Sequence, residues 1–422
     1  MPRNERPTAV IVDGYASGRF LNRAFARLGC DVIHMQSTEQ LIGALAAPAL
    51  EDYGRSMVCA TNADLDAVLR DLAMCRTVAV AAGSEVGVPL ADMLAERLGL
   101  PGNDTALTSA RRDKYTMIET LRAAGLRCAE QSLVSRPEQA VQWADAAGYP
   151  VVVKPLSSSS TDHVFICRDA AQTEAAAESV LGSANLFEQP NTRALIQSYL
   201  EGTEYVLDTV SATGRRYVCG VWEYQKQTSD TGRRTYDRNV LLDPDSHPVP
   251  ELIGYVDRVL QALGIANGPA HAEVILTADG PALVEIAARL NGGMDPAFHD
   301  LCLGANQADV TALAYARPEQ FAQLYADRIY RKRSDAIVHH STTAHVGVVE
   351  SVDQEIVEQI EALPTVHSLV VKLAPSRRIR PTVDLFTSPL RIYLADDDPA
   401  RILADYRAIQ ELKELVYRVL PT

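Results

Sequence analysis

The sequence lacks the surplus of positive charge that nucleic-acid binding requires, because its formal net charge is -14 over 422 residues. Phosphate backbones are held mainly by Lys and Arg, so no nucleic-acid partner is expected. The seven cysteines form no C-x-x-C motif, which predicts neither a disulfide framework nor a zinc site. There is no apolar run of the roughly 18 residues that a membrane span needs, and no apolar leader near residue 1. We therefore expect a soluble cytoplasmic protein without a membrane partner.

The chain is long enough for several domains, since single hydrophobic cores stop growing below this length. Residues 1–105 alternate apolar strands with amphipathic helices, which is typical of a Rossmann-like parallel α/β domain. The turn at residues 13–18 either cradles a phosphate or is an ordinary strand-to-helix turn. Strands around residues 194–227 alternate apolar and polar side chains, as half-buried antiparallel strands do. After about residue 306 helices and strands mix in an α+β segment.

A carboxylate-rich hairpin is the strongest chemical signal: HAEVILTADGPALVEIAARLNGG, residues 271–293. Alternate side chains of a strand share a face, so Glu285 and Arg289 point one way and Ile286 points into the core. A three-residue loop would place Glu273 opposite Glu285, whereas a two-residue Asp-Gly turn would place it opposite Ile286. We take the first register as the working assumption.

Two carboxylates that face each other repel unless a cation lies between them. Mg²⁺ suits Glu273 and Glu285, because it prefers oxygen ligands and bridges phosphate oxygens. Arg289 on the same face would hold a phosphate or a carboxylate through two hydrogen bonds. On these residues alone, the alternative is a surface hairpin with an ordinary Glu–Arg ion pair.

Two upstream lysines favour the first interpretation. Lys154 ends the apolar strand VVVKP just before a Ser-rich turn, and Lys114 begins a helix. A lysine at such a position is more often solvated than catalytic, yet charges are rarely buried unpaired. Taken in order with the small-residue turn and the two-carboxylate hairpin, the two lysines indicate a clamp for a triphosphate.

Six stretches in this order resemble the ATP-grasp carboxylate–amine ligases, most closely the L-amino acid ligase (dipeptide synthetase) branch. They are AGSEVGVPLADMLAERLGLPGN, RRDKYTMIETLRAAGL, YPVVVKPLSSSS, LIQSYLEGTEY, GPAHAEVIL and LVEIAARLNGG. The resemblance covers nearly the whole chain. It implies a multidomain protein of mixed α/β and α+β class with an ATP-grasp fold. Its expected parts are an N-terminal Rossmann-like domain at 1–105, an ATP-grasp domain at 106–305 with a central lid at about 148–200, and a C-terminal α+β domain at 306–422.

The resemblance also implies where ATP and Mg²⁺ bind, with the nucleotide between two α+β lobes and Glu273 and Glu285 as metal ligands. The nucleotide-binding residues that it implies are Lys114, Lys154, Ser158, Ser159, Ser160, Gln197, Leu200 and Glu204. The serines stand where the family usually has Gly, and Gln197 stands where a Glu is common. Ala287 occupies the Asn position of the common E-x-N-x-R pattern, so one metal ligand is missing. Glu204, taken alone, is equally a solvated strand residue.

The implied reaction joins an acid, such as an amino acid, to an amine through an acyl phosphate, with ADP and phosphate released. Positioning and charge neutralisation dominate phosphoryl transfer, so Lys154 and Arg289 are the expected catalytic residues. His271 orients an amino acid or takes a proton, unless its role is structural. Glu85 completes a site for metal or for a substrate amine, unless it only favours the dipole of a helix start.

The resemblance also implies a substrate pocket after Arg289, where Asn291, Gly292 and Gly293 would admit an acid larger than alanine. The alternative is that both glycines serve a turn that needs positive φ. The residues expected at the substrates are therefore Glu85, His271, Arg289, Asn291, Gly292 and Gly293. Residues 225–239 are expected to form a polar loop whose positive cluster is either solvated or recognises a substrate carboxylate.

Two other functions share these residues. One is a different ATP-grasp activity, such as carboxylation, γ-glutamyl transfer or ligation onto a carrier protein. The other is a non-catalytic nucleotide-binding module. This alternative is disfavoured because the chain retains the residues expected for catalysis and metal binding, namely Lys114, Lys154, Glu273, Glu285 and Arg289. Small-molecule acid and amine substrates are the expected partners, a homodimer is a compatible assembly, and natural product biosynthesis is the expected setting.

Overall fold

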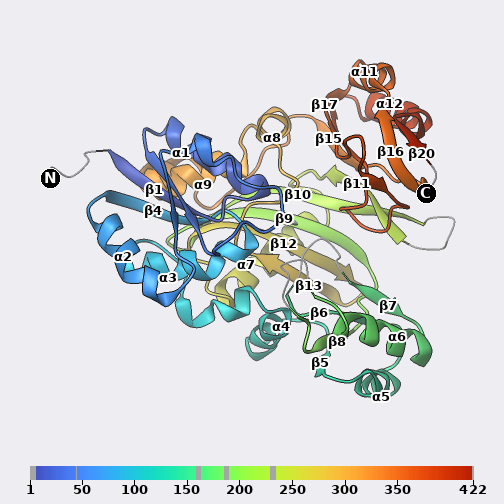
Figure 1. Cartoon of the computed structure of the whole chain (residues 1–422), viewed down its shortest axis with the longest axis horizontal. Helices are drawn as coiled ribbons and strands as arrows, with labels where there is room; N and C mark the ends of the chain where they lie inside the picture. Colours follow the sequence, from blue (N-terminus) through green and yellow to red (C-terminus); the bar gives the residue numbers. More distant parts are fainter. Residues whose placement is uncertain (1–5, 44, 158–162, 185–189, 229–233, 421–422) are drawn as a thin grey trace.

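The computed structural model describes residues 6–43, 45–157, 163–184, 190–228 and 234–420. The chain begins with a four-stranded parallel sheet in the order β3-β2-β1-β4 (Figure 1). Its elements are β1 (Pro7–Val12), α1 (Arg19–Arg27), β2 (Asp31–Gln36), β3 (Arg55–Val58), α2 (Asn62–Ala73), β4 (Arg76–Ala82) and α3 (Val88–Leu98). This arrangement confirms the parallel Rossmann-like architecture expected from the sequence.

Both faces of this parallel sheet are covered, which explains its almost unbroken apolar strands. Ala9 and Ile11 pack with α1 on one face, and Val10 and Val12 pack with α2 and α3 on the other. Helix α9 (Gln307–Ala316) comes from a distant part of the chain and joins the α1 side. The N-terminal sheet is thereby fixed to residues beyond 305.

A second, small antiparallel sheet in the order β5-β8-β6-β7 includes the residues expected to form a lid, and we call it the lid (Figure 1, green). Its elements are β5 (Gln131–Val134), α5 (Pro137–Ala147), β6 (Val151–Pro155), β7 (Phe165–Cys167), α6 (Ala170–Leu181) and β8 (Ala194–Ser198). Small residues of α5 and α6, such as Ala140, Ala144 and Ala177, let both helices pack closely on the sheet. Helix α4 (Lys114–Ala123) precedes the lid.

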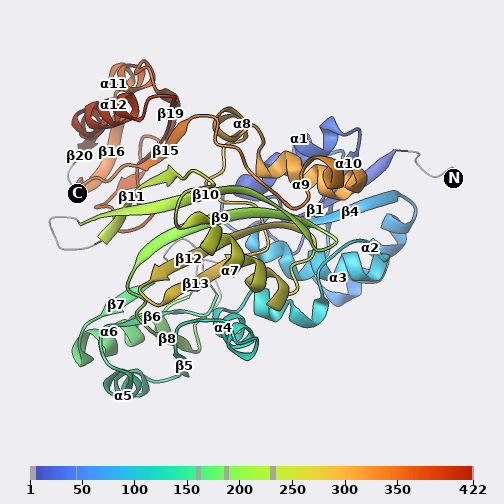
Figure 2. The same ribbon diagram turned by 180° about the vertical axis from the view of Figure 1, so that it is seen from behind.

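A nine-stranded sheet is the centre of the molecule and follows the path β13-β12-β9-β10-β11-β15-β19-β17, with β14 paired to β10 (Figure 2). Its strands are β9 (Thr203–Ala212), β10 (Arg215–Thr228), β11 (Arg234–Leu241), β12 (Gly268–Thr277), β13 (Gly280–Ala287), β14 (Arg328–Ile329), β15 (Asp335–His340), β17 (Val366–Val371) and β19 (Leu390–Asp396). The sheet continues without a break across the boundary expected at residue 305, and the three domain limits stay predictions.

Helices enclose this sheet on several sides. They are α7 (Val249–Ala262), α8 (Pro296–Leu303), α10 (Pro318–Leu324), α11 (Gln354–Glu361) and α12 (Pro399–Leu412). A three-stranded sheet of β16 (Gly347–Val352), β18 (Arg378–Ile379) and β20 (Tyr417–Leu420) ends the chain. Over the described ranges, no helix combines the length and the hydropathy that crossing a bilayer demands.

Two expectations about these strands are wrong. Strand β9 is buried at every position after Thr203 instead of alternating, because it lies in the middle of the sheet with α9 and α10 packed against it. The polar stretch from Arg234 to Asn239 is a strand and not a loop, because β11 pairs with β10 on one side and β15 on the other. Strand β10 pairs along the whole stretch, and β15 pairs with its last part from Arg238 onward, so the backbone groups find partners in the sheet.

Candidate active site

The hairpin of β12 and β13 places Glu273 directly opposite Glu285, as expected. The expected three-residue loop is wrong, because Thr277 pairs with Gly280 across a two-residue turn. The register shifts between Glu273 and Val274, so that Val284 is an extra residue on β13. Such a bulge re-aims the side chains that follow it. The bulge, and not the turn, therefore brings the two carboxylates together.

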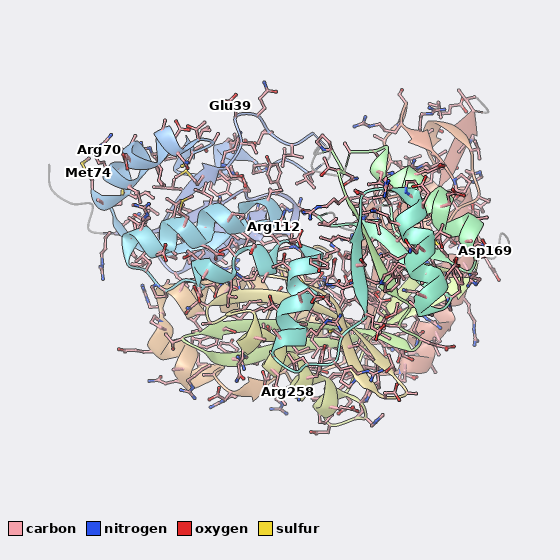
Figure 3. All side chains as sticks on the ribbon, turned by 90° about the horizontal axis from the view of Figure 1, so that it is seen from below. Glu39, Arg70, Met74, Arg112, Asp169 and Arg258 are labelled. Carbon is pink, nitrogen blue, oxygen red and sulfur yellow. The ribbon has the colours of Figure 1, made fainter. Side chains whose placement is uncertain are left out.

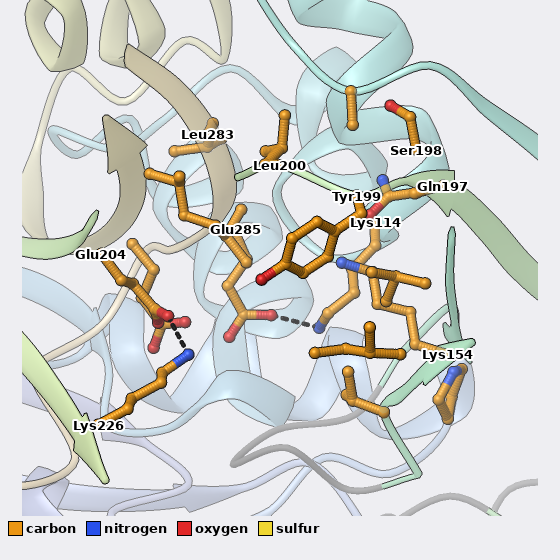
Figure 4. Close-up of a pocket in the computed structure, with 18 of the residues that line it drawn as sticks. Lys114, Lys154, Gln197, Ser198, Tyr199, Leu200, Glu204, Lys226, Leu283 and Glu285 are labelled. Atoms are coloured by element: carbon orange, nitrogen blue, oxygen red, sulfur yellow. Dashed lines mark hydrogen bonds and ion pairs between the residues drawn. The ribbon is translucent and has the colours of Figure 1, made fainter. Parts of the chain in front are cut away.

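Glu285 lies among cations. Its Oε2 is 2.6 Å from Lys114 Nζ, as Figure 4 shows. Burial alone would raise the pKa of Glu285, but Lys114 and the nearby charges of Lys154 and Arg289 outweigh burial and lower it. Glu285 is thus held as a carboxylate at neutral pH.

Glu273 is in the opposite situation, because burial and the charge of Glu285 raise its pKa. Its neighbour His271 is 3.6 Å away at Nε2, and His271 Nδ1 is 2.7 Å from Asp208 Oδ1. Burial disfavours protonation of His271, yet Asp208 and Glu273 prevail and raise its pKa to about 9. Asn291 Nδ2 donates to the other oxygen of Asp208 at 2.8 Å. His271 is therefore a positioned cation, which favours an orienting role over proton abstraction.

A cleft between the lid and the hairpin collects most of the residues expected at the nucleotide. Those that line it are Lys114, Lys154, Gln197, Leu200, Glu204, Glu273 and Glu285 (Figure 4). Ser158, Ser159 and Ser160 lie outside the described residues. Lys154 is only 4% exposed, so it is not a solvated strand end. Burial, followed by the charge of Lys114, lowers the pKa of Lys154 to about 8.

Gln197 lies on the lid side of this cleft and is buried. Its Nε2 donates to Gln131 Oε1 at 2.9 Å, and Gln131 donates in turn to the backbone oxygen of Tyr115. Across the sheet Gln197 pairs with Gln131 on β5 and with Val152 on β6. The lid strands and α4 together fix this side chain.

Glu204 is buried in the cleft rather than solvated. Lys226 forms an ion pair with it (Figure 4). The Tyr236 hydroxyl donates to it at 3.0 Å. Both partners come from the stretch expected to be a loop. A register shift between Gln225 and Lys226 accompanies their turn into the cleft, and no sequence signal marks such a shift. From the sequence, Lys226 and Tyr236 were expected only as part of a positive cluster that is solvated or binds a substrate carboxylate, and their contacts with Glu204 were not foreseen.

A smaller hollow beside the cleft contains Glu85, Arg112 and Arg289 together with Lys114 and Glu285. Glu85 Oε1 is 2.5 Å from Arg112 Nη1, and Glu85 Oε2 is 3.3 Å from Arg289 Nε. Figure 3 shows Arg112 where the N-terminal domain meets the start of α4. Glu85 does lie in the first turn of a short helix, but its side chain also positions two arginines. Sequence reasoning missed Arg112, which only the meeting of two domains brings to the site.

The segment after Arg289 contains the two glycines expected in the substrate pocket. Neither has a φ in the left-handed region, so the interpretation as a turn that needs positive φ is wrong. Gly293 N donates to Asn291 Oδ1 at 2.8 Å. A Cβ on Gly292 would meet nothing within 4 Å, and one on Gly293 would lie 3.7 Å from Arg391 Nη1. A Cβ could therefore be added at either glycine without a clash, and the substrate pocket here stays a prediction.

The fold and the site together define a class of protein. A parallel α/β domain, a small antiparallel lid and a large sheet enclose a cleft with two buried or half-buried lysines and two facing carboxylates. This combination is that of nucleotide-dependent ligases with the ATP-grasp architecture.

Comparison with known proteins agrees with this class. Residues 147–296 match the ATP-grasp domain family. Dapdiamide A synthase of Enterobacter agglomerans is 32% identical over 99% of this chain and 98% of its own. The L-arginine-specific L-amino acid ligase of Bacillus subtilis is 27% identical over 46% of each chain. The crystal structure of an L-amino acid ligase from Bacillus licheniformis shares the fold over 100% of both chains, with a TM-score of 0.73 and 19% identity.

The chain therefore belongs to the ATP-grasp family, in the branch of ADP-forming carboxylate–amine ligases. The homologous ligases of this branch form an amide bond through an acyl phosphate. The family and the fold expected from the sequence are both confirmed.

Proposed function

We propose that the protein joins the carboxylate of an amino acid, or of a similar acid, to the amino group of a second amino acid. ATP is cleaved to ADP and phosphate in the process. The observation that carries this proposal is the meeting of two lysines, two carboxylates and an arginine at one pair of adjoining hollows, namely Lys114, Lys154, Glu273, Glu285 and Arg289. The full-length similarity to dapdiamide A synthase supports amino acid substrates.

Nucleotide binding follows from the shape and charge of the cleft. Lys114 and Lys154 supply compact positive charges for phosphate oxygens. Gln197 and the backbone at Leu200 are suited to the adenine edge, and apolar cleft residues such as Val152 to its faces. Glu204, which Lys226 and Tyr236 hold in place, is suited to accept hydrogen bonds from the ribose hydroxyls.

The donor set fits Mg²⁺. Glu273 and Glu285 face each other, and the charge of Glu285 raises the pKa of Glu273, so a divalent cation between them would relieve their repulsion. Within the described ranges, no group of three or more His, Cys, Asp and Glu residues could hold a metal. Phosphate oxygens and water would therefore complete the coordination, and the cation would neutralise phosphate charge.

The chain's own residues mainly position groups and neutralise charge. The substrate carboxylate attacks the γ-phosphorus, the bond to ADP breaks, and the amine then displaces phosphate from the acyl phosphate. Lys154 holds the transferring phosphoryl group. Arg289, held by Glu85, stabilises the oxygen that becomes negative in the second step. His271, held by Asp208, orients the acid.

A matrix of amino acid pairs with ATP and Mg²⁺ tests this function, with phosphate release and product mass as readouts. We expect one group of pairs to release phosphate in proportion to a new amide product. Phosphate release that no pair raises above that of ATP alone would contradict the proposal. Product from bicarbonate or a carrier protein would indicate one of the other ATP-grasp activities.

Two further expectations accompany this function. The enzyme is expected to act in the cytoplasm on small-molecule acids and amines, and to form a homodimer. Light scattering during size-exclusion chromatography measures the mass directly, and a monomer at working concentration would contradict the dimer.

A further inference from the structure

One face of the nine-stranded sheet runs from the two glutamates to the C-terminal strands. Residues paired across antiparallel strands point to the same face, and so do residues two apart in one strand. Along this face the residues are Glu273, Val206, Trp222, Leu241, Asn239, Val338 and Tyr393. The hairpin glutamates and strand β19 therefore belong to one continuous surface.

Three basic residues stand at the far end of this face. His340 on β15 pairs with Arg391 on β19, and Arg391 pairs with Val370 on β17. Lys372 follows two residues after Val370. We name His340, Lys372 and Arg391 the basic cluster. The opposite face of these strands carries an apolar set, including Ile392, that packs on α11 and α12, so the cluster points away from those helices.

The basic cluster borders the segment that follows Arg289. The Tyr393 hydroxyl donates to Gly293 O at 2.9 Å, and a Cβ on Gly293 would lie 3.7 Å from Arg391 Nη1. Gly293 in turn donates to Asn291, which donates to Asp208 beside His271. The cluster is thus joined by direct contacts to the wall of the expected substrate pocket.

Lys372 connects the cluster with the nucleotide cleft from the other side. Its Nζ donates to Leu385 O at 2.9 Å, and Leu385 is one of the cleft residues. The cluster therefore lies between the substrate pocket and the mouth of the cleft.

The positive charge of the cluster is poorly compensated. Among the described residues, no carboxylate lies within ion-pair distance of Lys372 or Arg391. The acid whose charge raises the pKa of Lys372 is Asp384. Asp384 itself accepts hydrogen bonds from Thr387. Burial and the charge of Arg391 prevail over Asp384 and lower the pKa of Lys372 to about 7.

Several polar atoms of the cluster are buried without a hydrogen-bond partner. His340 is 3% exposed, and neither of its ring nitrogens has one. Arg391 Nε is also buried and unpaired, and so is Asn239 Oδ1 on the same face. Buried polar groups in proteins are nearly always hydrogen-bonded, so the unpaired donors among them, Arg391 Nε and one ring nitrogen of His340, call for an explanation. A bound anion would satisfy both the donors and the charge.

We propose that His340, Lys372 and Arg391 form a subsite for a substrate carboxylate that the amide bond does not consume. The inference rests on the proposed function, because an amino acid that supplies the amine keeps its α-carboxylate, and a diacid that supplies the acyl group keeps a second one. The guanidinium of Arg391 matches a carboxylate in shape, and a bound carboxylate would favour the protonated form of Lys372, which then adds a second positive charge. His340 supplies a ring N–H donor.

Arg391→Gln tests the subsite with the best amine-supplying amino acid from the matrix and its α-carboxamide. The parent enzyme is expected to prefer the acid. In the variant, KM for the acid rises roughly 10- to 100-fold, the range for one lost hydrogen bond to a charged group. The KM for the carboxamide and the KM for ATP stay within about twofold of their values in the parent. The variant therefore loses the preference for the acid over the carboxamide. Arg401→Gln on α12 removes an exposed guanidinium from the opposite side and is the matched control.

The source of the carboxylate is decided by a second arm, in which a diacid is compared with its monoamide as the acyl donor. Loss of preference in either arm supports the subsite and names its ligand. Equal preference in Arg391→Gln and parent, in both arms, overturns it. If Arg391→Gln lowers the melting temperature, Lys372→Met is the second variant and is expected to weaken the same preference.

Failure of the proposed function can be told apart from failure of the subsite. If the parent turns over no amino acid pair, the proposed function falls, and calorimetry of the same amino acids with the ADP-bound protein judges the subsite. Binding that Arg391→Gln weakens at least about tenfold supports it. Binding that the variant leaves unchanged, or no binding to the parent, overturns it.

Discussion

The two ends of the large sheet face differ in how their charges are paired. At the β12–β13 end three cations form ion pairs, Lys114 with Glu285, Lys226 with Glu204 and His271 with Asp208, and the charges of Glu285, Glu273 and Glu204 act on the fourth, Lys154. At the β15–β19–β17 end, the described residues offer the basic cluster no ion-pair partner. We call these the paired end and the unpaired end. A ligand that contains phosphates and a divalent cation carries both negative and positive charge, and is complementary to the paired end. The unpaired end suits a ligand that brings an anion alone.

The largest expected effect comes from removing one carboxylate of the paired end. Glu285→Gln keeps the shape of the side chain but loses the charge that faces Glu273 and Lys114. We expect kcat/KM for phosphate release to fall more than about 1000-fold, above the cost of losing one preorganised donor. The melting temperature should change little, because Glu285 lines a cleft rather than a core. Glu251→Gln on the exposed side of α7 is the control, and a loss below tenfold would contradict the metal-ligand assignment.

A smaller loss is expected from Lys154→Ala, which removes a compact charge from the same end. The expected cost is about 3 kcal/mol in kcat/KM, or about 150-fold, the size of one transition-state donor. Lys332→Ala removes a lysine that pairs with Asp335 away from the cleft, and should have no such effect. A kcat and an ATP KM within about twofold of the parent would show that Lys154 does not hold phosphate.

The pH dependence of nucleotide binding sharpens the comparison further. The pKa of Lys154 in the free protein is about 8, because burial and Lys114 lower it, and a bound phosphate would raise it. Affinity that depends on the protonated lysine is complete below pH 8 and declines as the pH rises above it. ADP should therefore bind roughly three- to tenfold more weakly at pH 9 than at pH 7. Calorimetry measures this, and an equal decline in Lys154→Ala would rule out Lys154 as the cause.

The smallest effect is expected where the two ends meet. A Trp side chain on Gly293 would occupy the space beside Arg391, so Gly293→Trp should shift preference towards small acyl donors. Each excluded methylene is worth about 1 kcal/mol, or about fivefold in relative kcat/KM. Competition between donors of increasing size measures the shift. Gly292→Ala adds a Cβ into open space and should keep the parent's ranking, and an unchanged ranking in folded Gly293→Trp would disprove the pocket.

Much of the fold was predictable because its signals are local. The spacing of apolar residues marks α1, α3 and α7, and the continuous apolar strands β1 and β4 indicate a sheet covered on both faces. The burial of β9 was not predictable, because its polar residues meet their partners only in the assembled sheet. Strand β11 was taken for a loop, because its residues are mostly polar and β15, one of its two neighbours in the sheet, lies far away in sequence.

The residues of the candidate site divide in the same way, into those that sequence motifs mark and those that only the fold brings together. Lys114, Lys154, Glu273, Glu285 and Arg289 stand in motifs whose order is visible along the chain. Arg112, Lys226 and Tyr236 carry no motif, and the structure alone brings them to the two hollows. The basic cluster was equally hidden, because β15, β17 and β19 each contribute or adjoin one of its residues.

By itself the sequence determined the family, the order of the elements and the charged residues of the hairpin, since each depends on residue type and short-range spacing. The tertiary structure alone decided which charges are paired. A bulge at Val284 set the two glutamates opposite each other, and the joining of β15 to β11 extended one sheet face from those glutamates to Arg391. Charge pairing acts over a few ångströms in space, and no spacing along the chain encodes those distances.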